Sequence, residues 1–261
     1  AEKYKASDLP VPPKSPAFTV GTPEWLDARL GGRFNGMIAP LAPFAFRGVL
    51  WYQGEDNARD HAAYGKLLPA MIADWRKNWD RELPFLIVQL PAYNADRKPD
   101  GTDWAAMREV QARVARTVPA CGLAVTIDNS DPDQLHPKNK PTVGDRLALV
   151  ALKQVYGRHV TAHGPTFDAI AVNGQDVRVR FREVAGGLVS KTGRNLKGFT
   201  IAGADKRFVP ADARIDGDDV VVSAAGVLKP VAVRYAWANA PAVSLFNAAG
   251  LPAPPFRSDD W

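Results

Sequence analysis

The sequence has little cysteine, no long apolar run and no cluster of basic residues. Its single cysteine, Cys121, cannot form an internal disulfide bond, and we expect it to be a small buried side chain. No stretch of 18 apolar residues occurs, which argues against a membrane span. The formal net charge is +5, but the basic residues are scattered, which argues against nucleic acid as a partner. The overall composition, with 46% hydrophobic and 23% charged residues, is ordinary for a globular protein.

The pattern of the 261 residues predicts three parts. Residues 1–33 begin like the end of a charged helix and then carry five prolines, which is typical of an extended connector. Residues 34–157 alternate apolar runs with amphipathic stretches, which implies an α/β domain with a mostly parallel sheet flanked by helices. We expect its strands at 47–52, 83–90 and 122–127, and its helices at 60–79, 104–118 and 143–156.

The third part, residues 158–261, has a different pattern. Short segments of alternating apolar and polar residues are separated by glycine-bearing turns, which is typical of strands. We expect strands at 177–181, 199–202, 220–222 and 231–237. Their spacing predicts a small all-β, sandwich-like module packed beside the α/β domain.

Polar residues follow the first predicted strand directly, in the turn Gln53-Gly54-Glu55-Asp56-Asn57. Ligands of α/β sheets bind at the carboxyl ends of the strands. Gln53 and Gly54 suit the stabilisation of an oxygen that becomes negative during acyl transfer, because an amide N–H can be aimed at it and glycine permits close approach. Glu55 would orient an amide or the loop, and Asn57 would hold a sugar hydroxyl or the turn itself. The alternative is a plain polar turn between strand and helix.

His136 is the best candidate among the four histidines for a general base. It follows the third predicted strand in a loop that also carries three aspartates, and a carboxylate that holds one ring nitrogen leaves the other free to accept a proton. Asp133 is the preferred partner because Asp-x-x-His brings acid and base into one turn, with Asp131 or Asp128 as alternatives. These acids could instead cap the helix predicted to begin near Val143.

A metal site is a weaker reading of the same loop. Carboxylate and imidazole ligands suit several divalent ions, but no second histidine lies nearby to complete a zinc site. We therefore expect neither a metal nor another cofactor.

Together these segments resemble the sialate O-acetylesterases, a family of carbohydrate acetylesterases of the SGNH hydrolase type. The likeness extends from about Phe34 to Pro255 and rests on many short segments in the family's order rather than on one motif. These segments are 34–41, 48–57, 74–76, 83–90, 131–140, 143–151, 234–237 and 250–257.

The resemblance implies an SGNH-hydrolase-like fold and removal of acetyl esters from sugars by a serine mechanism without metal. His136 would activate the serine and later protonate the leaving oxygen, and Asp133 would hold the imidazole. Gln53 and Gly54 would flank the negative oxygen, with Glu55 and Asn57 supporting the substrate or the turn. We expect a periplasmic or secreted enzyme, whose export signal would precede residue 1.

The family's serine block is missing from this sequence. No serine follows a buried strand and opens a helix, and Ser130 lies in the histidine's own loop without a glycine partner. One explanation is that the chain is the carboxyl-terminal part of a longer esterase and associates with an amino-terminal fragment that carries the serine, since lysosomal members of the family are made as two chains. The alternative is a relative that binds acetylated glycans without hydrolysing them.

Overall fold

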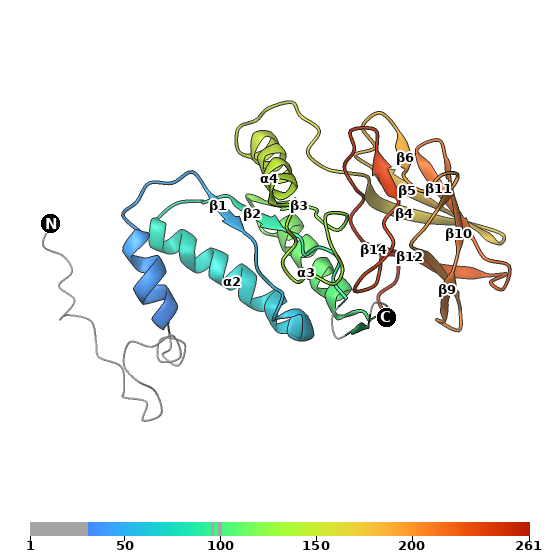
Figure 1. The fold of residues 1–261 in the computed structure, drawn as a ribbon, viewed down its shortest axis with the longest axis horizontal. Helices are drawn as coiled ribbons and strands as arrows, with labels where there is room; N and C mark the ends of the chain where they lie inside the picture. Colours follow the sequence, from blue (N-terminus) through green and yellow to red (C-terminus); the bar gives the residue numbers. More distant parts are fainter. Residues whose placement is uncertain (1–30, 95–96, 99–100) are drawn as a thin grey trace, which may run out of the picture.

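The computed structural model describes residues 31–94, 97–98 and 101–261, as an α/β part followed by a β module (Figure 1). The connector predicted for residues 1–33 therefore lies, except for its last three residues, outside the described part of the chain.

Three parallel strands form the centre of the α/β part, in the order β1-β2-β3. Helices α2 and α3 pack on one face of this sheet, against Phe85 and Ile87, and α4 packs on the other, against Leu86 and Val88. The predicted parallel sheet flanked by helices is confirmed. The elements are β1 Val49–Trp51, β2 Phe85–Val88, β3 Cys121–Ala124, α2 His61–Trp79, α3 Asp103–Thr117, α4 Lys140–Gln154, the π-helix η2 Phe34–Ile38, and the short 3-10 helices η3 Ala39–Leu41 and η4 Ala58–Asp60.

The starts of two helices follow from local capping. The Asp60 side chain accepts a hydrogen bond from the N–H of Ala63 at the start of α2. Helix α4 begins at Lys140, earlier than predicted, and its cap is Asn139, which accepts a bond from the N–H of Thr142. The reading in which the loop aspartates cap this helix is therefore wrong. Among the described helices, none is long and apolar enough to span a bilayer.

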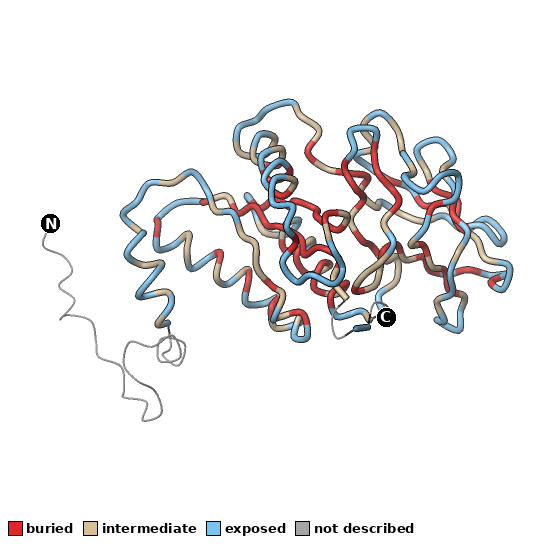
Figure 2. The backbone as a smooth tube through the Cα atoms, in the orientation of Figure 1, coloured by how far each residue is buried: buried red, intermediate tan, exposed pale blue. Residues whose placement is uncertain are grey.

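The β module consists of antiparallel strands in a five-stranded sheet, β4-β5-β11-β10-β7, a four-stranded sheet, β14-β12-β8-β9, and the pair β13-β6. Apolar side chains of the first two sheets share one core, which includes Val179 and Val220 from the first and Ile201 and Val233 from the second. Buried stretches of backbone run through the β module in Figure 2. The bounds are β4 Thr166–Asn173, β5 Asp176–Arg182, β6 Leu188–Ser190, β7 Asn195–Leu196, β8 Phe199–Gly203, β9 Phe208–Pro210, β10 Asp212–Asp216, β11 Asp219–Ser223, β12 Pro230–Tyr235, β13 Leu245–Asn247 and β14 Phe256–Arg257.

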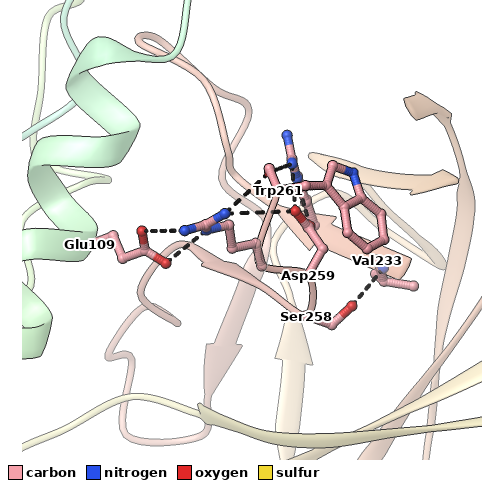
Figure 3. Close-up of polar contacts among 7 residues, drawn as sticks. Glu109, Val233, Ser258, Asp259 and Trp261 are labelled. Atoms are coloured by element: carbon pink, nitrogen blue, oxygen red, sulfur yellow. Dashed lines mark hydrogen bonds and ion pairs between the residues drawn. The ribbon is translucent and has the colours of Figure 1, made fainter. Parts of the chain in front are cut away.

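The two parts are joined by apolar packing and by ion pairs. Val125 and Ile127, which follow β3, belong to the core of the β module. Arg257 of β14 donates two hydrogen bonds to the carboxylate of Glu109 on α3, across 2.9 and 3.1 Å, as Figure 3 shows. Its guanidinium also lies 3.7 Å from Asp259, which is paired with Arg234. The module is thus fixed to helix α3.

The outer edge of β1 has no strand partner among the described residues. Leu50 points to the same face as its neighbour Leu86, but α4 covers only the β2 and β3 side of this face, and Leu50 is 64% exposed. A groove of about 180 Å³ lies here between β1 and the end of α4, lined partly by Leu50, Val155 and Tyr156. The sheet therefore has an apolar, uncovered edge.

Candidate functional site

A cavity of about 700 Å³ lies at the carboxyl ends of the three parallel strands. The loops that follow β1, β2 and β3 all contribute to it, as the parallel arrangement requires, because these strand ends share one edge of the sheet. Its lining residues are Tyr52, Gln53, Glu55, Asp56, Ala58, Arg59, Tyr93, Asp103, Trp104, Leu135, His136 and Lys140. The structure therefore brings Gln53 and Glu55 to the same cavity as His136, 83 to 81 positions away in the sequence.

The turn after β1 is held from two helices. The carbonyl oxygen of Gln53 accepts hydrogen bonds from Tyr64 Oη on α2 and from Gln111 Nε2 on α3, each 3.1 Å long. Trp51 Nε1 donates in turn to Tyr64 Oη across 3.0 Å. Burial raises the pKa of Tyr64, so its hydroxyl stays protonated and can keep donating at neutral pH. The Gln53 backbone is thus fixed before any ligand binds.

Gly54 is required where this turn passes the helices. Its φ of 141° is one that side-chain-bearing residues rarely adopt, and a Cβ atom there would lie 3.2 Å from Gln111 Nε2. Gly54 is itself buried and is not among the residues that line the cavity. Asn57 is also outside the lining, and its Oδ1 accepts a hydrogen bond of 2.8 Å from Gln53 Nε2. Asn57 therefore orients the side chain of Gln53.

The loop after β3 presents His136 to the cavity with an exposed imidazole. Among the described residues, no hydrogen bond or ion pair links this ring to a carboxylate. Asp133 is exposed and accepts a hydrogen bond of 3.4 Å from Asn94 Nδ2, and Asp131 Oδ1 accepts one of 3.3 Å from the Asp133 N–H. Asp128 is held by Arg146 of α4. The choice of Asp133 as the partner of His136 stays a prediction.

The loop after β2 supplies a wall of the cavity that the sequence analysis missed. Tyr93 lies against Trp104 with ring centroids 5.1 Å apart, and Trp104 Nε1 is bonded to the carbonyl oxygen of Pro91. Lys140 Nζ lies 4.9 Å from the centroid of the Tyr52 ring on another side. The position of Tyr93 just after the second strand was the available signal, since the flanking strands both end in site residues.

Arg108 of α3 holds the backbone of the loop that forms this wall. It is fully buried and donates hydrogen bonds of 2.7 to 2.9 Å to the carbonyl oxygens of Leu90, Pro91, Ala238 and Asn239. Burial lowers the pKa of Arg108 to about 9, so the guanidinium is still charged at neutral pH. It connects the loop after β2 to the loop after β12.

The cavity combines groups suited to a hydroxyl-rich ligand and to acyl transfer. Aromatic side chains offer flat apolar surfaces, carboxylates and amides offer hydrogen bonds, and His136 offers a proton acceptor. None of the serines that the structure describes lines it. Within the described residues, no group of three or more His, Cys, Asp or Glu side chains is arranged to hold a metal ion.

Comparison with known proteins agrees with this chemistry. Residues 29–153 match the model of a family described as carbohydrate esterase, sialic acid-specific acetylesterase. Sialate O-acetylesterase of Mus musculus is 30% identical over 263 residues, covering 85% of this chain and 46% of the mouse protein. The Homo sapiens protein of the same name is 28% identical, covering 85% and 48%.

A solved structure is also similar. The crystal structure of a carbohydrate acetylesterase from Xanthomonas citri superposes with a TM-score of 0.82 at 43% identity, over 87% of this chain and 54% of the other. The chain thus spans about half the length of the curated relatives it matches.

Proposed function

Since this chain belongs to the carbohydrate esterase family of sialic acid-specific acetylesterases, whose domain it carries at residues 29–153, we propose that it is part of an enzyme that hydrolyses acetyl esters of sugars. It supplies His136 as the proton-transfer group, Asp133 as its partner and the Gln53-Gly54 turn beside the reacting oxygen. The nucleophilic serine comes from a segment outside these 261 residues.

One observation carries the proposal: Gln53, Glu55 and His136 line one cavity although they follow strands β1 and β3, which are separated by β2. An acyl-transfer site needs donors for the negative oxygen and a base on opposite sides of the reacting carbonyl group. Their joint presence at one sheet edge, beside aromatic rings, supports a sugar ester as substrate.

The reaction follows from these roles. The serine Oγ attacks the acetyl carbonyl carbon while His136 takes its proton, and the carbonyl oxygen becomes negative beside Gln53. As the tetrahedral state collapses, His136 gives the proton to the sugar oxygen, and the sugar leaves as an alcohol. Water then attacks the acetyl-serine while His136 takes its proton, and as this second tetrahedral state collapses His136 gives that proton to the serine Oγ, which restores the serine and releases acetate.

The uncovered edge of β1 is where we propose that the serine-bearing segment attaches. Another parallel strand can pair with the backbone of β1 along this edge. The exposed side chains of Leu50 and Tyr156 provide apolar surface next to it. A strand added there would end at the same sheet edge as Gln53. Its carboxyl-terminal loop would then reach the cavity from the side opposite His136.

Fluorophosphonate labelling tests this assignment directly, because the reagent modifies only activated serines. The natural full-length protein is labelled, digested and analysed by mass spectrometry, and its hydrolysis of O-acetylated sialic acid and acetylated xylan is measured in parallel. We expect one labelled serine, outside the sequence of this chain. His136→Ala should abolish labelling and turnover, whereas His159→Ala, which alters an exposed histidine outside the cavity, should change neither.

Labelling of Ser130 would contradict the proposal that the nucleophilic serine lies outside this chain. A protein that binds acetylated sugars in calorimetry but shows neither label nor turnover would instead be the non-catalytic glycan-binding relative.

A further inference from the structure

Asn239 of the β module uses each of its polar groups to hold the loop between β2 and α3. Its Oδ1 accepts a hydrogen bond of 2.9 Å from the Trp104 N–H, and its Nδ2 donates one of 3.1 Å to the Lys98 carbonyl oxygen. Its backbone N–H donates to Gly101, and its carbonyl oxygen accepts from the Tyr93 N–H. The side chain is buried, at 3% exposure.

The bond to Trp104 caps helix α3 from a distant part of the sequence. Thr102 occupies the N-cap position but makes no side-chain cap bond, so the free N–H groups of the first turn need another acceptor. Asn239, which lies 135 positions after Trp104, provides it. The start of α3 is therefore fixed by the β module and not by its own sequence.

The loop held in this way and the start of α3 form one wall of the cavity, through Tyr93 of the loop and through Asp103 and Trp104 of the helix. Trp104 is almost fully buried, so Tyr93 is the ring that a ligand can reach, with Trp104 behind it. Asn239 fixes the backbone of both residues, by its carbonyl oxygen and by its side chain. It does not line the cavity.

We propose that Asn239 is a positioning residue for sugar binding, by which the β module sets the place of Tyr93 against the sugar ring. This inference rests on the proposed function. A ring that is already held in place binds the apolar face of a sugar at a lower entropic cost, and without the Asn239 side chain the loop would lose its bonds at the Lys98 carbonyl oxygen and at the N–H of Trp104, whose ring lies behind Tyr93. The β module thereby contributes to substrate affinity without contacting the substrate.

The test uses the full-length enzyme with Asn239→Ala and, as a matched control, Asn247→Ala. Asn247 lies in the same module, is 1% exposed and makes a similar set of bonds, to His163, Glu183 and Leu251, but none to the cavity loops. Both variants should lose stability. KM and kcat are measured with an acetylated sugar, and hydrogen exchange is followed in peptides that contain Tyr93 and Trp104.

For Asn239→Ala we expect KM to rise on the order of tenfold with a much smaller change in kcat, as loss of a few oriented hydrogen bonds implies, together with faster exchange in the loop. Asn247→Ala should leave KM and the loop unchanged. Unchanged exchange in Asn239→Ala, or an equal rise of KM in both variants, would overturn the inference. If exchange rises but the wild type neither binds nor hydrolyses acetylated sugars, the proposed function fails while the anchoring of the loop stands.

Discussion

Asp128 and Arg146 form a bidentate ion pair between the loop after β3 and helix α4, with 2.8 Å between Arg146 Nη2 and Asp128 Oδ2. Arg146 also donates to the carbonyl oxygen of Val125. Of the three aspartates near His136, this one is committed to holding the base of the loop, and its carboxylate oxygens are occupied.

We expect Asp128→Ala to lower the free energy of unfolding by on the order of 3 kcal/mol, because it leaves a guanidinium largely buried without its counter-charge. The side chains are only 11% and 16% exposed, so water can compensate little. Urea unfolding followed by circular dichroism measures the loss. A variant as stable as wild type would contradict a structural role for the pair.

Asp133→Asn should leave stability nearly unchanged, because Asp133 is exposed, and should lower kcat of the full-length enzyme by several orders of magnitude if it holds the His136 imidazole. Asp131→Asn is the matched comparison in the same loop. Initial-rate kinetics with an acetylated sugar separate the two, and a loss confined to Asp131→Asn would transfer the role to that residue.

Gln53→Ala should lower kcat by about 10²- to 10³-fold, the effect of removing one donor to the negative oxygen. Asn57→Ala should lower it less, because the Gln53 amide remains but loses the partner that orients it. The double variant should be no worse than Gln53→Ala alone, since both changes act through one amide. Additive losses in a kinetic double-mutant cycle would show that Asn57 acts independently.

If the proposed serine-bearing segment binds at β1, Leu50→Asp should prevent the association, because it places a charge on the apolar edge of this strand. Its effect on the stability of the chain by itself should be within about 0.5 kcal/mol, as for other exposed positions. Native mass spectrometry measures the association. Val172→Asp, at a 52% exposed strand residue of the β module, should bind normally; equal binding by both variants would place the contact elsewhere.

Stability should fall at acidic pH through His163. Burial, and secondly the charge of Lys153, lower the pKa of His163 below its ordinary 6.5, although Glu183 opposes this. The unfolded chain therefore takes up the proton first, so the free energy of unfolding decreases as pH falls through 6.5 and levels off below the folded-state pKa. Unfolding midpoints at pH 7.5 and 5.0 should differ less in His163→Gln than in wild type, whereas exposed His159→Gln should behave as wild type.

The sequence was sufficient for the α/β layers because their signals are local. The run Phe85–Val88 is wholly buried, and the buried residues Tyr64, Leu68 and Ile72 of α2 recur at helical spacing. The strands that were not predicted include short ones such as β9 and β13, which have three residues each and exist through their partners, but also β4, with eight residues, and β10, with five. Their positions depend on tertiary packing, which a local pattern does not contain.

The candidate site also has a part that local sequence signals predict and a part that they do not. Gln53 and His136 were predicted to meet because the ends of parallel strands share one edge, a rule that requires no coordinates. Tyr93 could have been found by the same rule, because it follows the second strand, whereas the placement of Trp104 depends on Asn239, more than a hundred positions away. A cap supplied from so far along the chain leaves no pattern around Thr102.

Arg108 has a consequence for how such proteins can diversify. Among the residues that the structure describes, its buried guanidinium is bonded to backbone carbonyl oxygens alone, two from the α/β part and two from the loop after β12. A replacement of the β module by another domain would remove the two carbonyl oxygens after β12. The Arg108 guanidinium would then stay buried with half of its hydrogen bonds missing. A different module could take its place only if it presented carbonyl oxygens to Arg108 at the same two positions.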